Sequence, residues 1–261
     1  MRLFPLNLLM LCAMLSLEAC SVKEDRSDCP CWLEVDIRDC HRYGDEVCLR
    51  WHPQDGKVSA ENIALGPWQD VVGKEMPRGF VRYCAYSGVS SSRLSGEDLI
   101  IPEGCACDSL YLYSAIVDTS EETAEDVVRM HKEYAVISIV FSYGSGMEAE
   151  GSRVELSGDW RGVSLNDGTP VRGTFRCEAS RSGGNLWSVN VPRQGDSSLR
   201  MTVHTGDVHE SLLLGEYLEQ AGYDWTEANL RDVRLEIDWS SWTLSLEIEP
   251  WQAGIVYQIE Y

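Results

Sequence analysis

The alternation of apolar and polar residues along much of the chain most limits the folds it can adopt. In residues 233–239 an apolar residue alternates strictly with a charged one. Successive side chains of a β-strand point to opposite faces, so this pattern predicts a strand with one buried face. Ten such segments predict ten strands, at residues 32–37, 47–51, 80–86, 110–117, 136–141, 171–177, 186–191, 199–203, 233–239 and 244–248. Short strands separated by Gly, Asp, Ser and Pro clusters are typical of β-sandwiches.

A glycine-rich polar stretch after residue 143 predicts the boundary between two modules. The expected modules are residues 29–143 and 152–261, and each has the size of one sandwich. Residues 211–222 predict the one short helix, in the second module, because Leu214, Leu218 and Ala221 share a stripe and Gly222 suits a helix stop. The aromatic residues after Gly222 are expected to pack against the sandwich. The acidic run at 118–126 predicts a solvated loop or a short helical start.

The N-terminus has the features of a secretory signal peptide covering residues 1–19. Arg2 precedes a largely apolar run, and the run ends at Ala19-Cys20. The tetrapeptide Leu17-Glu18-Ala19-Cys20 resembles the bacterial lipobox, in which the cysteine receives a diacylglycerol and becomes the first mature residue. Glu18 departs from the usual small or apolar residue at its position. An ordinary signal peptide, cleaved before an unmodified Cys20, is the alternative.

The next residues, 20–28, predict a polar tether between the lipid and the fold. Lys23, Glu24 and Asp25 are similar to the lysine-plus-acids signal that sends lipoproteins of Gram-negative anaerobes to the outside of the outer membrane. Each buried CH₂ of an acyl chain contributes about 0.8 kcal/mol, so three chains would hold the protein on the bilayer. The expected location is therefore the surface of the outer membrane.

Charge and cysteine content narrow the functional classes. The chain has 22 Lys and Arg against 42 Asp and Glu, which gives a net charge of −20. Binding to phosphate backbones needs a positive surface, so a nucleic-acid partner is excluded. The 10 cysteines favour an oxidising compartment.

Three cysteine pairs are candidates for disulfides. Cys29 with Cys31 and Cys105 with Cys107 both form C-x-C sequences, whose thiols would share one face of an extended strand. Two adjacent bridges could therefore join these pairs. Cys40 and Cys48 flank a turn and could clasp a hairpin. The roles of Cys84 and Cys177 stay open, and Cys177 is either a free buried thiol or a partner between the modules.

No arrangement of residues indicates catalysis, a metal site or a cofactor. Ser145 lacks the G-x-S-x-G frame of a nucleophile elbow, and no glycine-rich loop precedes a lysine. C-x-C leaves only one residue between thiols, whereas structural zinc sites favour two to four. His204 and His209 are five residues apart and are expected at solvated or turn positions. We therefore expect a protein that is not an enzyme and binds no metal.

Several segments, in this order, resemble the FimB family of fimbrial anchor subunits, which belongs to the type V pili of Gram-negative anaerobes. They are residues 23–30, 191–199, 214–218 and 222–225, and the closing strand that ends near Trp251. The resemblance implies two transthyretin-like β-sandwiches in a lipoprotein that attaches a fimbrial shaft subunit to the outer membrane. It also implies a role in limiting fimbrial length, and assembly by addition of a strand to an open sheet edge.

Two other functional classes compete with the anchor. A glycan-binding surface lipoprotein would use some of the 9 Trp and 11 Tyr as exposed stacking platforms. Aromatic residues in a groove would favour that function, whereas burial in the two cores would count against it. A secreted hydrolase is the third class, and no nucleophile, base or metal set supports it.

Overall fold

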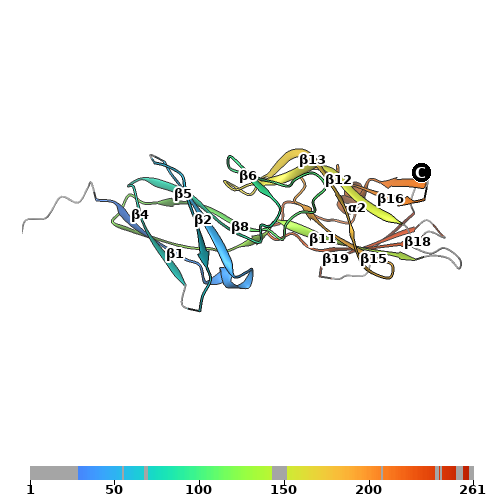
Figure 1. The fold of residues 1–261 in the computed structure, drawn as a ribbon, viewed down its shortest axis with the longest axis horizontal. Helices are drawn as coiled ribbons and strands as arrows, with labels where there is room; N and C mark the ends of the chain where they lie inside the picture. Colours follow the sequence, from blue (N-terminus) through green and yellow to red (C-terminus); the bar gives the residue numbers. More distant parts are fainter. Residues whose placement is uncertain are drawn as a thin grey trace, which may run out of the picture.

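The computed structural model describes residues 29–142 and 152–258, apart from residues 55, 68–69, 207, 239–240, 242 and 251–254. The expected signal peptide, Cys20, the tether and the export signal at Lys23, Glu24 and Asp25 lie outside the described residues. The described chain forms two β-sandwiches placed end to end, so the molecule is elongated (Figure 1). The prediction of an all-β protein with two tandem sandwiches is confirmed.

The first sandwich packs a three-stranded sheet against a five-stranded sheet. Its strands are β1 (Cys31–Asp36), β2 (Glu46–Pro53), β3 (Ser59–Ala64), β4 (Val71–Met76), β5 (Phe80–Ser87), β8 (Tyr111–Asp118), β9 (Thr123–Val127) and β10 (His131–Lys132), with a 3-10 helix η2 (Arg38–Arg42). The strand orders are β4-β1-β9 and β10-β8-β5-β2-β3. Leu33 and Val35 of β1 and Leu49 and Trp51 of β2 alternate with outward-facing residues and are fully buried in the shared core.

The second sandwich packs two larger sheets. Its elements are β6 (Arg93–Ser95), β7 (Asp98–Ile100), β11 (Tyr134–Ser142), β12 (Arg153–Ser164), β13 (Pro170–Glu178), β14 (Ser180–Gly183), β15 (Leu186–Pro192), β16 (Arg200–Thr205), β17 (Val208–Leu212), α2 (Leu214–Gln220), β18 (Val233–Asp238), β19 (Thr243–Ile248) and β20 (Ile255–Gln258). One sheet has the order β14-β15-β11-β18-β19-β20. The other has the order β17-β16-β12-β7-β6, with β13 also paired to β12. Leu214 and Leu218 of α2 are buried in the core between them.

Strand pairing shows that the boundary between the modules is not at residue 143, where the sequence predicted it. β11 runs parallel to β18 and antiparallel to β15, so it belongs to the second sandwich. The hairpin β6-β7 also belongs there, because β7 pairs with β12. The chain therefore enters the second sandwich at residue 93, returns to the first for β8 to β10, and crosses again before β11. Composition marks the glycine-rich stretch of sequence after residue 143 but carries no information on partners distant in sequence.

All ten strands predicted from alternation are present, whereas two other expectations change. The helix is confirmed but shorter than expected, because Ser211 and Leu212 belong to β17. The acidic run at 118–126 ends in a strand, β9, which pairs in parallel with β1. Within β9, Asp126 accepts hydrogen bonds from the hydroxyls of Tyr83 (2.8 Å) and Tyr113 (3.1 Å), so this carboxylate is part of the packed structure.

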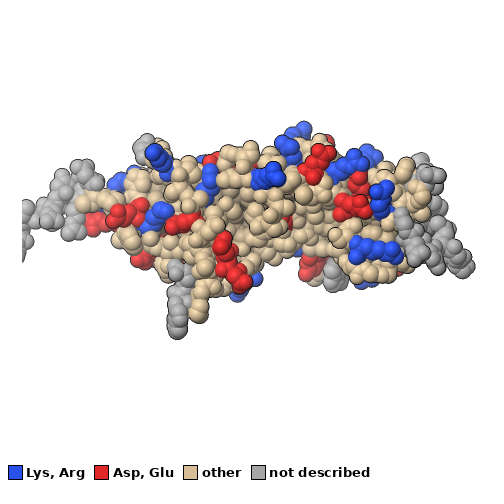
Figure 2. All heavy atoms as spheres, viewed as in Figure 1, with Lys and Arg blue, Asp and Glu red and all other residues tan. Residues whose placement is uncertain are grey.

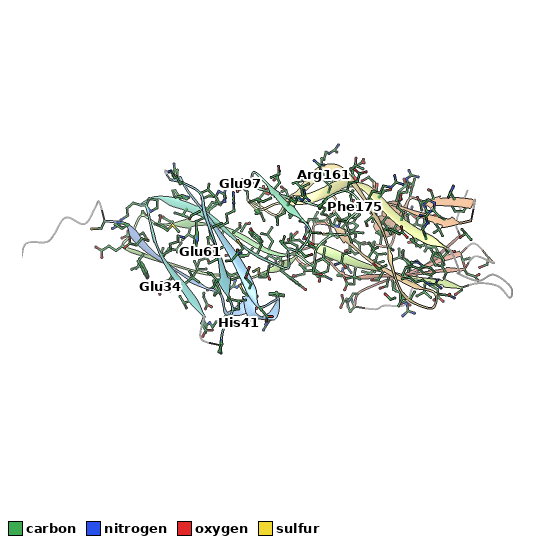
Figure 3. All side chains as sticks on the ribbon, in the orientation of Figure 1. Glu34, His41, Glu61, Glu97, Arg161 and Phe175 are labelled. Atoms are coloured by element: carbon green, nitrogen blue, oxygen red, sulfur yellow. The ribbon has the colours of Figure 1, made fainter. Side chains whose placement is uncertain are left out.

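The two sandwiches meet through a small apolar cluster and a polar contact. The cluster consists of Cys84, Leu99, Leu110, Leu112, Val163 and Leu165. Beside it, Glu97 of the β6-β7 turn lies where the two halves meet (Figure 3). Its carboxylate accepts hydrogen bonds at 3.1 Å from both Nε and Nη2 of Arg50 in β2. His52 Nε2 lies 3.0 Å from Glu97 Oε2. This contact ties the hairpin of the second sandwich to the first.

Candidate functional site

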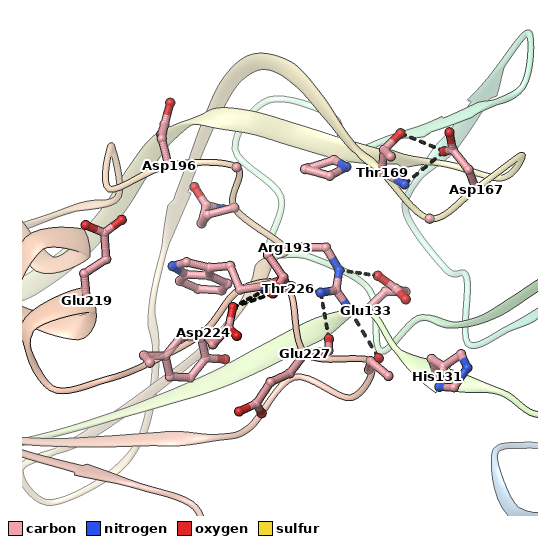
Figure 4. Close-up of a pocket in the computed structure, with 17 residues that line it drawn as sticks. His131, Glu133, Asp167, Thr169, Arg193, Asp196, Glu219, Asp224, Thr226 and Glu227 are labelled. Carbon is pink, nitrogen blue, oxygen red and sulfur yellow. Dashed lines mark hydrogen bonds and ion pairs between the residues drawn. The ribbon is translucent and has the colours of Figure 1, made fainter.

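A pocket of about 630 Å³ is lined mainly by residues of the second sandwich, together with His131 of β10 in the first. Four segments distant in sequence form it (Figure 4). They are residues 131–133, which comprise β10 and the residue before β11, the turn 167–170 between β12 and β13, the loop 193–196 after β15, and the end of α2 with the following loop, 219–228.

A buried ion pair fixes the floor of this pocket. Arg193 Nε donates to Glu133 Oε2 at 2.7 Å, and both side chains are more than 90% buried. The same guanidinium donates to the backbone carbonyls of Trp225, Glu227 (2.8 Å) and Ala228 (3.3 Å). Burial raises the pKa of Glu133, although Arg193 opposes that shift. The side chain of Arg193 therefore connects the loop after α2 to Glu133, the residue before β11.

Carboxylates are held around the rim by local hydrogen bonds. Asp224 Oδ1 accepts from the backbone N–H (2.8 Å) and hydroxyl (2.7 Å) of Thr226. Asp167 Oδ1 accepts in the same way from Thr169, at 3.1 and 2.7 Å. The threonine hydroxyl bonds lower the pKa of both carboxyls, so both are charged at neutral pH. Glu219 extends from the end of α2 (Figure 4).

Two aromatic residues form one wall and are themselves buried. Gly222, with φ +78°, ends α2, and the Tyr223 N–H donates to the Leu218 carbonyl at 2.9 Å. Tyr223 and Trp225 follow, with ring centroids 4.6 Å apart and exposed fractions of only 4% and 6%. The expected helix stop followed by aromatic packing is therefore confirmed. These rings supply little flat surface on which a sugar could stack.

Three residues that line this pocket, His131, Gln194 and Trp225, each have one buried polar side-chain atom without a hydrogen-bond partner in the described chain, and for His131 it is Nδ1. Gln194 is 2% exposed, and its Nε2 donates to the Pro192 carbonyl at 2.7 Å. Its Oε1 is unpaired, as is the indole Nε1 of Trp225. Native structures pair most buried polar atoms, so these three atoms are exceptions to that rule.

The predicted disulfides do not agree with where the cysteines lie. Cys31 is buried between the sheets of the first sandwich, whereas Cys105 and Cys107 pack in the core of the second. Bridges between the two C-x-C pairs would therefore have to join separate sandwiches. The described cysteines are free thiols, namely Cys29, Cys31, Cys40, Cys48, Cys84, Cys105, Cys107 and Cys177.

Cys40 and Cys48 are also not brought together. Cys40 lies in the first core, whereas Cys48 alternates with Val47 and Leu49 on β2 and so faces away from that core. The backbone of Cys177 instead lies beside Gly104 in an isolated parallel bridge, close to Cys105. These pairings were predicted from sequence spacing alone. Spacing does not show which face of a strand packs against which core, so it could not reveal that the paired cysteines lie apart.

His204 and His209 were the remaining residues considered as metal ligands. His204 and His209 are cross-strand neighbours on β16 and β17, with Nδ1 atoms 2.7 Å apart, and are not turn residues. Among the described residues, no group of three or more His, Cys, Asp and Glu could hold a metal ion. No described helix is long and apolar enough to cross a membrane. On the face seen in Figure 2, acidic and basic side chains are interspersed over both halves.

Sequence reasoning missed the ion pair at the centre of this pocket. Arg193, Gln194, Tyr223, Asp224 and Trp225 lie in stretches that carry the fimbrial resemblance, but nothing in them indicates a partner for Arg193. Glu133 is 60 residues away in sequence. The only signal in the sequence was that a charged residue, Arg193, follows an apolar strand. This signal does not indicate a buried ion pair.

Comparison with known proteins identifies the fold. No family model matches the chain, and no curated protein matches it. A solved structure described as a candidate polysaccharide-binding protein of Bacteroides thetaiotaomicron has a TM-score of 0.64 at 13% identity, and the match covers 88% of this chain and 98% of that one. A candidate adhesin of the same organism has a TM-score of 0.61 at 15% identity, with coverage of 90% and 100%.

The fimbrial anchor protein Mfa2 from Porphyromonas gingivalis is also similar. Its TM-score is 0.58 at 12% identity, and the match covers 87% of this chain and 99% of that one. The likeness to these three structures extends through both sandwiches, and the TM-scores and coverage establish a shared fold.

Proposed function

We propose that this protein is a surface lipoprotein of the outer membrane that anchors a type V fimbria and limits its length. The observation that carries the proposal is the combination of a lipobox-like Cys20 with a two-sandwich fold similar to that of a fimbrial anchor protein. The proposed role is one of attachment and assembly, without catalysis.

The position of the first strand in the molecule supports this role. β1 begins at Cys31, in the sandwich remote from the C-terminal half, and the second sandwich lies at the other end of the long axis (Figure 1). Acyl chains on Cys20 would hold the first sandwich near the bilayer and direct the second outward, with Lys23, Glu24 and Asp25 as the export signal. The shaft subunit would then meet the second sandwich.

Strand addition would join the two subunits. An edge strand offers backbone N–H and C=O groups on its outer side, which a strand of the next subunit can pair. In the second sandwich, β14 and β20 end one sheet, and β17, β6 and β13 are edge strands of the other. These five edges are the candidate docking positions for the shaft subunit.

Two variants of the producing cell test the anchor. Deleting the gene should release fimbriae from the cells or change their length, and fimbriae that stay attached with normal length would refute the proposal. Replacing Cys20 with Ala should move the protein and any attached filaments into the medium. Membrane fractionation of the Cys20→Ala protein like that of the wild type would refute the lipid attachment.

Glycan capture is the second candidate, favoured by the likeness to the candidate polysaccharide-binding structure. The described aromatic residues support it less well. Trp51, Trp187 and Trp225 are buried, whereas Trp32 is 44% exposed on the outer face of β1. A glycan array probed with the purified protein tests this function, and loss of a bound glycan in Trp32→Ala would favour it over the anchor.

A further inference from the structure

The hairpin formed by β16 and β17 brings two histidines into contact. His204 and His209 are directly opposite each other in the antiparallel ladder, and β17 is an edge strand of its sheet. Their Nδ1 atoms are 2.7 Å apart, and their ring centroids are 4.7 Å apart. Val203 and Leu212 point from the same two strands into the second core, so both imidazoles lie on the outer face. The pair is therefore open to ions in solution.

The contact between the two rings leaves room for only one hydrogen atom between them. A neutral imidazole carries a hydrogen on one ring nitrogen and a lone pair on the other. At 2.7 Å one Nδ1 donates and the other accepts, because two facing N–H groups would collide. When the donating ring carries its hydrogen on Nε2 instead, two Nδ1 lone pairs face each other across the gap. This change of tautomer releases no proton, and it leaves two ligand atoms for one metal ion.

The spacing of the two nitrogens indicates a coordination geometry. Imidazole nitrogens suit copper, nickel and zinc ions, and the bond to the metal is about 2.0–2.1 Å long. At that length, two ligand nitrogens are about 3.3 Å apart around a tetrahedral ion and about 2.9 Å apart at neighbouring corners of a tetragonal ion. The observed 2.7 Å is closer to the second value. Tetragonal sites favour copper(II) and nickel(II), and copper(II) binds more tightly than nickel(II).

We propose that His204 and His209 bind one copper(II) ion through their Nδ1 atoms. The two nitrogens occupy neighbouring equatorial positions, and water fills the others, because no third His, Cys, Asp or Glu among the described residues completes a metal-binding group. The pairing of β16 with β17 already holds both rings in place, so binding orders little additional backbone.

Charges on the same face limit the expected affinity. Arg153 of β12 lies opposite His204 in the ladder and is exposed, so its positive charge repels a metal ion. Glu155, two residues further along β12, attracts one, but it forms an ion pair with Arg176 at 2.8 Å. With two protein ligands and charges of both signs nearby, we expect an exchangeable site.

The sequence predicted that the chain binds no metal, and the structure gives a reason to revise this expectation. The two histidines are five residues apart, which matches no metal-binding helix motif. They meet only because the hairpin register places them opposite each other. The inference concerns a site distinct from Cys20 and does not depend on the fimbrial role.

Copper titration of the purified full-length protein tests the site. Accessible thiols are first blocked with iodoacetamide, so that they neither bind nor reduce the ion. Electron paramagnetic resonance with one equivalent of copper(II) should show a tetragonal spectrum with two equatorial imidazole nitrogens. Competition with a chelator measures the affinity, and zinc(II) should bind at least about 10-fold more weakly than copper(II).

Two single substitutions separate the pair from isolated histidines. His204→Gln and His209→Gln change side chains of the outer face, so both variants should fold, which circular dichroism checks. Each should weaken copper(II) binding about 10-fold or more, because the second imidazole binds the ion intramolecularly. Each should also remove one imidazole nitrogen from the spectrum. His41→Gln, in η2 of the first sandwich, is the control and should change neither result.

Equal copper(II) affinity of the wild type and His209→Gln would contradict a shared site, and so would two imidazole nitrogens in the spectra of both single variants. Zinc(II) binding as tight as that of copper(II) would contradict the assigned geometry. If His41→Gln weakens binding as much as His204→Gln, any histidine serves equally and the proposal is wrong. Fimbrial attachment in cells bears on none of these results, so failure of the anchor function can be told apart from failure of this site.

Discussion

Asp108, in the connection between β7 and β8, is 5% exposed and accepts hydrogen bonds from three consecutive serines of another loop. Its Oδ1 accepts from Ser90 Oγ (2.6 Å), from Ser91 Oγ (2.8 Å) and from the Ser91 N–H (2.9 Å). Its Oδ2 accepts from the Ser92 N–H at 2.8 Å. Burial by itself raises the pKa of this carboxyl, but the serine donors outweigh it and lower the pKa well below 3.8. One side chain thus joins two irregular segments near the junction.

Replacing Asp108 with Asn should lower the free energy of unfolding at pH 7 by about 1–3 kcal/mol, because an amide cannot accept all these hydrogen bonds. A folded pKa below the unfolded value adds stability above about pH 4, and this stability is lost as the pH falls through the folded pKa. Urea unfolding at pH 7 and pH 3 should therefore show a smaller difference between wild type and variant at pH 3.

Asp159→Asn is the control, because Asp159 is exposed on β12. It should change the unfolding midpoint little at either pH. An Asp108→Asn protein as stable as the wild type at pH 7 would contradict the role assigned to the serine contacts.

The thiols should differ in reactivity according to their burial. Burial raises the pKa of Cys40, Cys84 and Cys177 to about 12, so they are protonated and inaccessible at pH 8. Cys29 is exposed. Brief iodoacetamide treatment of the native protein, followed by peptide mass spectrometry, should label Cys29 and leave these three unlabelled until urea is added.

Two results would contradict this account. One is labelling of Cys40 in the native protein as fast as that of Cys29. The other is a disulfide-linked peptide that joins Cys29 or Cys31 to Cys105 or Cys107, because these residues lie in different sandwiches.

At the scale of strands and helices, sequence periodicity predicted the elements whose two faces differ in environment. β18 is an example, with Val233, Leu235 and Ile237 buried and Arg234 and Glu236 exposed. α2 was predicted for the same reason, with a period of 3.6 residues in place of two. Its start could not be placed, because Ser211 and Leu212, the first residues of the predicted range, belong to β17.

β12 was missed although it is the longest described strand, with 12 residues. Its register with β13 shifts on both sides of Trp160, and each shift moves the following side chains to the other face. Gly162 permits close approach of β7, because a Cβ there would lie 2.2 Å from the Leu99 carbonyl oxygen. These requirements come from neighbouring strands, so local alternation cannot reveal them. The pocket was missed for the same reason, since Glu133 and Arg193 meet only after both sheets have formed.

The β6-β7 hairpin should depend on Glu97 for its protection against hydrogen exchange. Glu97→Gln removes the charge that holds Arg50, so the hairpin should open more often. We expect exchange of the amides in residues 93–100 to increase about 10-fold, which corresponds to about 1.4 kcal/mol of local stability. Hydrogen exchange with mass spectrometry measures this, and Glu103→Gln is the control, because Glu103 is an exposed residue of the connection that follows β7.

Exchange in the β6-β7 peptide that stays at the wild-type rate in Glu97→Gln would show that strand pairing alone holds the hairpin. An equal increase in β18, which is remote from Glu97, would indicate global destabilisation in place of local opening.

At the scale of the whole molecule, each sandwich has its own core and the two are coupled through a small junction. The first core contains residues such as Leu49 and Trp51, and the second contains residues such as Ile137 and Trp187. Between them, Ser114 Oγ of β8 donates to the Leu165 carbonyl at 2.6 Å. Within the second sandwich, the Leu165 N–H donates to the Glu97 carbonyl at 2.8 Å. The proposed anchor function requires this junction to transmit force from the second sandwich to the first.

Leu165→Ala tests how far the junction couples the sandwiches. Leu165 is 1% exposed within the junction cluster, and truncating a buried leucine costs about 2–5 kcal/mol. This loss of stability should weaken the contact between the two sandwiches, because Leu165 belongs to neither large core. Calorimetry should therefore show the unfolding transition broadening or dividing into two, while the second core keeps its own transition. Small-angle scattering of the folded variant should show a wider distribution of interdomain distances, because relative motion of domains follows when their interface weakens.

Leu49→Ala, in the first core, is the matched control and should lower the stability of the first sandwich without widening that distribution. An unchanged scattering profile for Leu165→Ala, together with a single sharp transition, would mean that the contact between Arg50 and Glu97 and the continuous chain suffice to hold the two sandwiches as one unit.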